Sequence, residues 1–343
     1  RVRFTNTKLR VFCKLFIFFM PPKVAIIILN YNGLKDTIEC LESLKQITYP
    51  NYQVIVVDNA SKGNDADILE EKYKDYIILI RNKENLGFSE GNNTGIKYAL
   101  SKDFDYIWLL NNDTVVDKEA LGEMVKLAER DEKIGIVGSK FLYYQKPDVI
   151  QTLGGSDKIT WKGQGSYIHP LEKDREEFNS NFEIKGYIYG ASLLAKRKVI
   201  EEIGLLDKNY FMWAEEVDWC LRAQRKGWKL FYCGKSKVWH KEGASLGTDK
   251  EKKFLWKKSR RSTLQRFVVI GYLEMRNHLY FVNKNFGRGK MWLYFFIKNF
   301  PEFIRKFVGV IIFDDQKMAR IKLLTLGIRD GIKGKMGKPK EFA

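Results

Sequence analysis

The first candidate for chemistry is the segment Asn111-Asn112-Asp113, which follows an apolar run at residues 106–110. The apolar run predicts a buried strand, so the segment would lie where that strand ends. A carboxylate next to amide oxygens suits a hard divalent cation that also holds phosphate groups. An Asx turn between the strand and the next helix explains the same residues equally well, and the pattern alone leaves both interpretations open.

The second candidate is a group of three carboxylates, Glu215, Glu216 and Asp218, in the first turn of a helix predicted over residues 215–226. The positive end of the helix dipole would keep them ionised, as a general base at neutral pH requires. Helical spacing places Glu215 and Asp218 on one face with Arg222. Glu216 points to another face. The alternative is ordinary placement of acidic residues at a helix start, with an Asp218–Arg222 ion pair.

Further polar residues lie at predicted strand ends and turns. Asp58 ends the second strand, where a carboxylate can accept hydrogen bonds from a nucleotide, although a turn or helix cap is the simpler explanation. His240 follows the strand-like residues 237–239 and would be a metal ligand only if the fold brings it beside Asp113. Residues 85–95, NLGFSEGNNTG, carry glycines that allow close approach to a ligand. The segment is neither a dinucleotide-binding fingerprint nor a P-loop.

An alternation of strands and helices would position these side chains. Short apolar runs predict the strands, and apolar residues at helical spacing predict the helices between them. The alternation indicates an α/β fold, a doubly wound and mostly parallel sheet with helices on both faces. Ligands of such sheets bind beyond the carboxyl ends of the strands. The predicted strands are 24–29, 53–57, 76–80, 106–110, 134–137, 186–195, 228–232 and 237–239, the predicted helices are 38–44, 90–100, 118–130, 199–204 and 215–226, and residues 139–185 are predicted to be an irregular insertion.

In this order the segments resemble the family 2 glycosyltransferases, which have the GT-A fold, and in particular the branch with rhamnosyltransferases and galactofuranosyltransferases. The resemblance covers residues 23–246 and rests on the ordered occurrence of several segments. It implies transfer of a sugar from a UDP-, dTDP- or GDP-linked donor to a hydroxyl of a glycan or lipid-linked acceptor. The segments are VAIIILNYNG, VIVVDNAS, NLGFSEGNNTG, WLLNNDT, YGASLLAKRKVIEEIGLLD, FMWAEEVDWCLRAQRKGW and VWHKEG.

The resemblance also implies roles for single residues. Glu216 matches the general base, Glu215 its acidic neighbour, and Asp218 a further acidic residue near the acceptor. Asp113 matches the metal-binding carboxylate, and His240 a histidine that can join the same divalent cation, Mn²⁺ or Mg²⁺. The implied mechanism is one direct displacement, which inverts the anomeric configuration. The positions that match the donor site are Asn30, Asn32, Asp58, Gly87, Asn92, Asn111, Asn112, Gly190 and Ala191.

Two positions depart from the family pattern. Asn111 occupies the first position of the DxD motif, so the site has one carboxylate fewer and a cation would be held more weakly. Glu215-Glu216 stands where the family more often has Glu-Asp, and the longer side chain changes the reach to the acceptor. The change at Asn111 leaves open a catalytically weak protein that only binds sugar nucleotides.

The net charge of +18 is concentrated at the two ends of this 343-residue chain. Residues 251–343 hold 22 basic and 7 acidic residues, a net charge of +15, and residues 1–20 add +5. Residues 21–250 are close to neutral, with a net charge of −2. A basic tail indicates an anionic partner, either nucleic acid or acidic lipid. The tail matches no nucleic-acid-binding motif, so we expect no nucleic-acid partner.

The basic C-terminal region is predicted to be helical and amphipathic. Residues 291–313 mix aromatic and aliphatic side chains with basic ones, which argues against a transmembrane span. Residues 317–336 gather four apolar side chains on one face, as in a helix that lies at a lipid surface. We therefore predict a cytoplasmic protein, peripheral on the inner face of the cell membrane; the alternative is that these helices pack on the catalytic domain. The four side chains are Met318, Ile321, Leu324 and Ile328.

The chain is thus divided into an N-terminal extension at residues 1–22, a GT-A catalytic domain at residues 23–250 and a membrane-associated helical region at residues 251–343. We read Met20 as the true start, with a short membrane-touching segment as the alternative. A competing function is a nucleotidyltransferase, which shares a similar nucleotide-binding sheet. That class carries a GxGxR-type loop after its first strand, where this chain has NYNGLKD.

Overall fold

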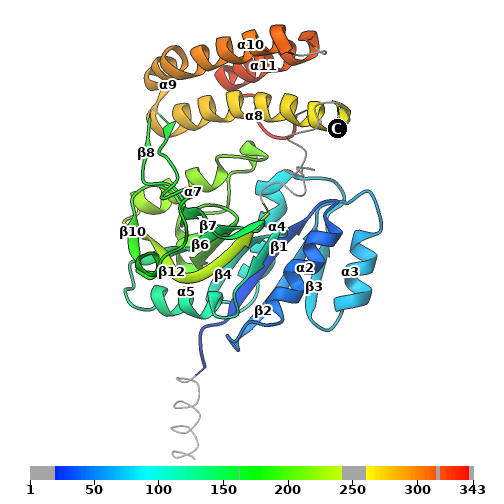
Figure 1. Ribbon diagram of the computed structural model, residues 1–343, viewed down its shortest axis with the longest axis vertical. Coiled ribbons are helices and arrows are strands. Elements are labelled where there is room, and N and C mark those ends of the chain that lie inside the picture. Colours follow the sequence, from blue (N-terminus) through cyan, green and yellow to red (C-terminus); the bar gives the residue numbers. More distant parts are fainter. Residues whose placement is uncertain (1–19, 162, 242–259, 314–316, 340–343) are drawn as a thin grey trace, which may run out of the picture.

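The computed structural model describes residues 20–161, 163–241, 260–313 and 317–339 (Figure 1). The prediction that concerns residues 1–19 lies outside this range. The described chain forms an α/β domain around a ten-stranded sheet, with a layer of C-terminal helices stacked against it. The main path through the sheet runs β10-β12-β6-β11-β4-β1-β2-β3, while β5 pairs with β12 and β7 pairs with β6.

The elements follow one another in the predicted alternation through the first half of the chain. The strands are β1 (Val24–Asn30), β2 (Tyr52–Asp58), β3 (Ile77–Arg81), β4 (Tyr106–Asn111), β5 (Thr114–Val116), β6 (Ile134–Tyr143), β7 (Lys146–Leu153), β8 (Ile159–Thr160), β9 (Gly163–Gln164), β10 (Phe182–Ile184), β11 (Ser192–Lys196) and β12 (Lys229–His240). The helices of the domain are α2 (Leu34–Leu44), α3 (Asp65–Tyr73), α4 (Gly87–Leu100), α5 (Ala120–Ala128), η1 (Glu176–Asn179), α6 (Arg197–Ile203), η2 (Lys208–Tyr210) and α7 (Glu215–Arg225).

The first four strands form the parallel part of the sheet and bring their carboxyl ends together. β1 pairs with β2 on one side and with β4 on the other. This register places Asn30 opposite Asp58, and Leu29 opposite Asn111. The candidate residues that follow these strands therefore lie along one edge of the sheet, as the sequence predicted.

Helices cover both faces of the sheet and bury two apolar clusters. Ile27 of β1 packs in the cluster with α4, α6 and α7, whereas Ile26 and Ile28 pack in the cluster with α2, α3 and α5. Successive side chains of a strand point to opposite faces, which explains why the strands are continuous apolar runs. Gly95 of α4 lies over Ile27, where a Cβ atom would come within 2.6 Å of that side chain. This glycine therefore allows tight packing of helix on sheet.

The second part of the sheet contains both parallel and antiparallel strand pairs, and its structure shows that three predictions were wrong. β11 runs antiparallel between β4 and β6, and it is shorter than the strand predicted at residues 186–195. β12 is one strand where two were predicted, with an irregular pairing to β6 between Cys233 and Lys237. Residues 139–185 contain β7 to β10 and the end of β6 instead of an irregular insertion. β8, β9 and β10 are only two or three residues long, so no alternation of apolar and polar residues reveals them. β7 becomes evident only through its antiparallel pairing with β6.

The C-terminal helices pack on the α/β domain as a layer of their own (Figure 1). They are α8 (Arg260–Phe286), α9 (Arg288–Tyr294), the π-helical turn η5 (Phe295–Asn299), α10 (Phe300–Phe313) and α11 (Lys317–Lys333). Leu279 and Val282 of α8 are buried in the same apolar cluster as α4, α6 and α7. None of the described helices is long and apolar enough to cross a bilayer.

Three of the four apolar side chains on the predicted lipid-facing side of α11 pack inward, while Met318 is exposed, which corrects the prediction that this face touches lipid. Leu324 is buried against Met275 of α8, and Ile321 and Ile328 pack beside it. Gly327 permits this close approach, because a Cβ atom there would lie 2.5 Å from the Tyr272 carbonyl oxygen. For α11 the alternative interpretation, packing on the rest of the protein, is therefore right.

Candidate active site

A cavity of about 230 Å³ opens beyond the carboxyl ends of β1 and β4. It collects residues from both halves of the sheet, from the start of α4 and from the segment before α7. Gly190 lies within van der Waals distance of Glu216, since a Cβ atom there would be 3.5 Å from that side chain. The predicted residues that line the cavity are Gly87, Asn111, Asn112, Asp113, Gly190, Ala191, Glu215, Glu216 and His240.

Asp113 and His240 face each other in this cavity. Pairing of β12 with β5 brings their segments together, and the Lys241 N–H donates to the Asp113 carbonyl oxygen at 3.0 Å. His240 Nε2 lies 3.3 Å from Asp113 Oδ1, and both residues are buried. His240 Nδ1 lies 3.0 Å from Gln151 Oε1, an oxygen that accepts a hydrogen bond when Nδ1 carries a proton; in that neutral tautomer Nε2 can bind a cation. A proton or a divalent cation between these two atoms would stabilise the pair.

The Asp113–His240 pair is the candidate metal site. Among the described residues, no group of three or more His, Cys, Asp or Glu side chains could hold a metal ion. A carboxylate oxygen and an imidazole nitrogen are nevertheless ligands that Mn²⁺ accepts. A cation bound here would take its remaining ligands from amide oxygens, water or phosphate oxygens.

Glu215 and Glu216 begin α7, and burial dominates their electrostatics. The Oε2 atom of each is buried and has no hydrogen-bond partner within the described part of the chain. Burial, with the neighbouring Glu216 carboxylate, raises the pKa of Glu215 well above its usual value. Burial also raises the pKa of Glu216 to about 7, although backbone N–H groups of the helix start oppose it. The prediction that the helix dipole keeps this pair fully ionised is therefore wrong, because loss of hydration outweighs the dipole.

Residues 25–204, more than half of the chain, match the sequence profile of glycosyl transferase family 2. The chain belongs to glycosyltransferase family 2. This family assignment confirms the resemblance that the ordered segments indicated.

Relatives of this family 2 chain are named for glycan synthesis. The low-salt glycan biosynthesis hexosyltransferase Agl10 of Haloferax volcanii is 25% identical over 61% of this chain and 64% of its own length. The amylovoran biosynthesis glycosyltransferase AmsB of Erwinia amylovora is 27% identical over 60% of this chain and 65% of its own. The chain thus spans just under two thirds of each. GalNAc-T7, in a crystal structure with UDP, GalNAc and Mn²⁺, is 17% identical and aligns with a TM-score of 0.54 over 75% of this chain and 51% of its own, which confirms the GT-A fold.

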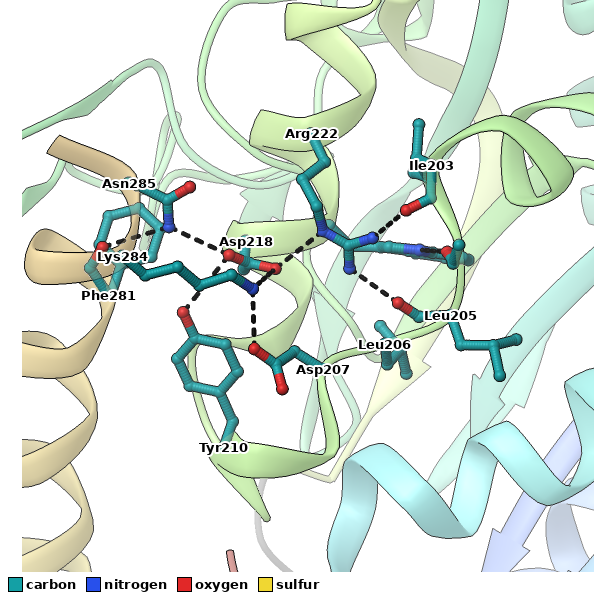
Figure 2. Close-up of polar contacts among 12 residues, drawn as sticks. Ile203, Leu205, Leu206, Asp207, Tyr210, Asp218, Arg222, Phe281, Lys284 and Asn285 are labelled. Carbon is teal, nitrogen blue, oxygen red and sulfur yellow. Dashed lines mark hydrogen bonds and ion pairs between the residues drawn. The ribbon is translucent and has the colours of Figure 1, made fainter. Parts of the chain in front are cut away.

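Asp218 does not line the cavity of this family 2 chain, and its predicted place near an acceptor is corrected. Figure 2 shows the Asp218 carboxylate at the centre of a polar network between α7 and α8. Its Oδ2 accepts from Arg222 Nε and from Lys284 Nζ, both at 2.9 Å. Its Oδ1 accepts from Asn285 Nδ2 at 3.0 Å. The side chain is fully buried, and the Asp218–Arg222 pair of the alternative interpretation is present.

Replacing Asp218 with Asn is expected to lower the free energy of unfolding by about 3 kcal/mol, because two cationic groups lose their buried partner. Asp67→Asn is the control, since the Asp67 side chain is 72% exposed and its pair with Arg81 is worth only about 0–1 kcal/mol. Urea unfolding of both variants measures the difference. If Asp218→Asn instead unfolds like the wild type and loses turnover, Asp218 has a catalytic role.

The predicted donor residues Asn30, Asn32, Asp58 and Asn92 lie beside the cavity without lining it. Asn30 Nδ2 donates to Asp58 Oδ1 at 2.9 Å, in a buried network at the ends of β1 and β2. Asn32 Oδ1 accepts from the Lys62 N–H at 2.7 Å. Asn92 Nδ2 donates to the Phe88 carbonyl oxygen at 2.9 Å. These bonds shape the loops around the cavity, and the direct donor contacts of the four residues stay predictions.

Several lining residues were not singled out in the sequence. Asn59 donates from Nδ2 to Asn85 Oδ1 at 3.0 Å and to the Gly87 carbonyl oxygen at 3.1 Å. Both asparagines fall inside the motif segments, so their position next to Asp58 and Gly87 was an available signal. Met212 and Trp213 also line the cavity, and both lie in the segment FMWAEEVDWCLRAQRKGW, which was singled out for its carboxylates. The further lining residues are Leu29, Tyr31, Phe88 and Tyr189.

A second cavity of about 250 Å³ adjoins the first. Glu216, Tyr189 and Trp213 line both cavities. The second is further lined by aromatic side chains of the segment before β11 and by α8, a helix that lies outside the matched family region. Its other lining residues are Tyr167, Tyr187, Ala214, Glu274, Asn277 and His278.

Proposed function

We propose that this chain transfers a sugar from a nucleoside-diphosphate donor to a hydroxyl group of a glycan or lipid-linked acceptor. The transfer would serve the synthesis of a cell-surface polysaccharide or glycolipid. The observation that carries the proposal is one cavity that contains the Asp113–His240 pair and Glu216, a carboxylate with one oxygen that has no hydrogen-bond partner among the described residues. The family and the names of the relatives support it.

In this proposal Glu216 is the general base. It takes the proton of the acceptor hydroxyl while that oxygen bonds to the anomeric carbon and the bond from this carbon to the diphosphate oxygen breaks. A pKa near 7 leaves Glu216 partly ionised at neutral pH and strong enough to accept the proton. Burial and the neighbouring Glu216 carboxylate raise the pKa of Glu215 well above its usual value, so Glu215 is the member of the pair that keeps a proton. One base and one displacement imply inversion at the anomeric carbon.

Asp113 and His240 are proposed to hold a divalent cation, Mn²⁺ or Mg²⁺. When bound, the cation would neutralise the negative charge of the departing nucleoside diphosphate. Asp113 directly precedes β5 and His240 ends β12. The pairing of these two strands would fix the position of the cation at the edge of the sheet. The Mn²⁺ and UDP in the GalNAc-T7 crystal structure agree with this assignment.

The two cavities suggest where each substrate binds. The first cavity contains the proposed metal site and is assigned to the donor. The second cavity is assigned to the acceptor, because Glu216 lines both and must reach the acceptor hydroxyl. Tyr167 and Tyr187 would offer apolar faces to a sugar ring, and Glu274 and His278 of α8 polar groups.

The proposal is tested by incubating the protein with UDP-, dTDP- and GDP-sugars, with and without Mn²⁺, and with extracted membrane lipids or glycans. Release of the nucleoside diphosphate and a sugar-sized gain in product mass are expected. Release of pyrophosphate from a sugar phosphate and a nucleoside triphosphate would instead identify a nucleotidyltransferase. Binding of a sugar nucleotide without turnover would identify the catalytically weak protein.

We further propose that the protein lies on the inner face of the cell membrane. The helical stretch from α9 to α10 exposes apolar side chains at helical spacing, and the basic residues Lys290, Lys298 and Arg305 are exposed along it. Amphipathic basic helices of this kind lie at anionic lipid surfaces. We call the exposed set the apolar stripe: Trp292, Leu293, Phe296, Ile297, Phe300, Ile304, Val308 and Ile311.

The double variant Phe296→Ser, Ile297→Ser is expected to bind anionic vesicles at least about tenfold more weakly than the wild type, because two exposed apolar side chains no longer enter the lipid. Met318→Ser is the control, since Met318 is 81% exposed but lies outside the apolar stripe. Sedimentation with phosphatidylglycerol vesicles measures binding, which added salt should weaken. Absence of binding by the wild type, or equal binding by the double variant, would contradict the proposal.

A further inference from the structure

The segment just before the two glutamates has an unusual backbone. Phe211, Trp213 and Ala214 all have positive φ angles, of 65°, 72° and 74°. Residues with a Cβ atom adopt this region rarely, and they keep it only when the surroundings hold them there. Glu215 and Glu216 follow directly, so whatever holds this segment also sets the position of their carboxylates. We call residues 210–214 the base loop.

The carbonyl groups of the base loop are held by Asn277 of α8. Asn277 Nδ2 lies 3.1 Å from the Tyr210 carbonyl oxygen, 2.7 Å from that of Met212 and 2.9 Å from that of Trp213. The carbonyl of Phe211 is held from the other side, by the Phe88 N–H at 2.6 Å. Two elements distant in sequence thus hold the loop, and one amide nitrogen, with two hydrogens, lies within hydrogen-bond distance of three of its carbonyl oxygens.

The amide of Asn277 is itself held in place. Arg276 Nε donates to Asn277 Oδ1 at 2.9 Å, which turns Nδ2 toward the base loop. Arg276 Nη2 also donates to the Tyr210 carbonyl oxygen at 2.9 Å. Both residues are almost fully buried. Beyond the glutamates, Lys284 and Asn285 bind Asp218 (Figure 2), so α8 contacts the chain before and after Glu215-Glu216.

We propose that Asn277 is a positioning residue: it holds the base loop in its strained conformation and thereby places Glu216 between the donor and acceptor cavities. The inference rests on the proposed role of Glu216 as the base. With this role for Asn277, α8 is part of the active site. The helix nevertheless lies outside the region that matches the family profile and beyond residue 250, where the catalytic domain was predicted to end. Helix α8 then connects the apolar stripe to the base loop, because α9 follows α8 in the chain and packs in the same apolar cluster.

The test compares three variants of the full chain. Asn277→Leu keeps the number of heavy atoms and the branching of the side chain but has no donor, Asn277→Gln keeps an amide donor, and Asn285→Ala weakens the contact of α8 with α7 without touching the base loop. For Asn277→Leu, kcat per folded enzyme is expected to fall about 10- to 100-fold, and more than the donor KM rises, because the base is displaced for the chemical step. Asn277→Gln should recover part of kcat, and Asn285→Ala should keep it.

A loss of kcat that is equal in Asn277→Leu and Asn285→Ala, or equal in the Leu and Gln variants, would overturn the inference. Hydrogen exchange of peptides across residues 210–217 provides a readout that needs no activity. Faster exchange is expected in Asn277→Leu and wild-type exchange in Asn285→Ala; wild-type exchange in both overturns the inference even if no donor is turned over. The wild type could show no turnover while the variants still differ in hydrogen exchange as expected. That result would refute the proposed function but retain the inference that Asn277 holds the base loop.

Discussion

Replacing Glu216 with Gln is expected to reduce kcat about 10²- to 10⁴-fold, the contribution of a positioned general base. The amide has nearly the same shape as the carboxylic acid but cannot take the acceptor proton. Donor binding should persist, because the Asp113–His240 pair is unchanged. Initial rates of nucleoside diphosphate release, with a binding titration of the donor, measure the two effects separately.

Two matched variants sharpen this experiment. Glu216→Asp keeps a carboxylate with a shorter reach, and the family more often has Asp here, so it should retain more activity than Glu216→Gln. Glu183→Gln is the surface control, because Glu183 lies on β10 and pairs with the exposed Lys185. Equal rates for wild type and Glu216→Gln would remove Glu216 from the mechanism.

The same variant should change stability with pH in a defined direction. The pKa of Glu216 is raised in the folded state, from 4.5 to about 7, so ionisation opposes folding. The stabilising effect of the protonated group is complete below about pH 4.5 and is lost as the pH rises through about 7. Glu216→Gln does not ionise, so its stability relative to the wild type should rise by about 1–3 kcal/mol between pH 4.5 and pH 8. Thermal melts across this range check the sign, and a relative loss at pH 8 would contradict the buried state of the carboxylate.

Replacing Asp113 with Ala is expected to reduce transfer at least about 10²-fold at saturating Mn²⁺, because the cation loses its only carboxylate of the Asp113–His240 pair. The fold should persist, since strand pairing of β5 with β12 uses backbone groups. The dependence of kcat on Mn²⁺ concentration measures the effect, and circular dichroism checks the fold. Asp148→Ala is the control, because the Asp148 side chain is 64% exposed. Comparable rates for wild type and Asp113→Ala in saturating metal would exclude Asp113 as the metal ligand.

The sequence by itself determined the parallel part of the sheet and much of the site. β1, β2 and β4 are continuous apolar runs, and each ends in polar residues that a parallel sheet must gather at one edge. Two candidate groups could be recognised in the sequence because the residues that carry their chemistry are adjacent in the chain. These groups are Asn111-Asn112-Asp113 and Glu215-Glu216. Local information was sufficient for β1, β2 and β4, whose side chains are buried on both faces of the sheet.

Only the tertiary structure decided which interpretation of each ambiguous residue holds. His240 is paired with Asp113 because β12 runs beside β5, and Asp218 is structural because α8 brings Lys284 and Asn285 to it. Helix position predicted ionised glutamates, but burial beneath distant segments raises the pKa of both. The support of the base loop by Asn277 was likewise invisible, since a lone asparagine in a helix carries no local signal. Burial, pairing and docking depend on residues far apart in the chain, and for that physical reason no local pattern could have settled them.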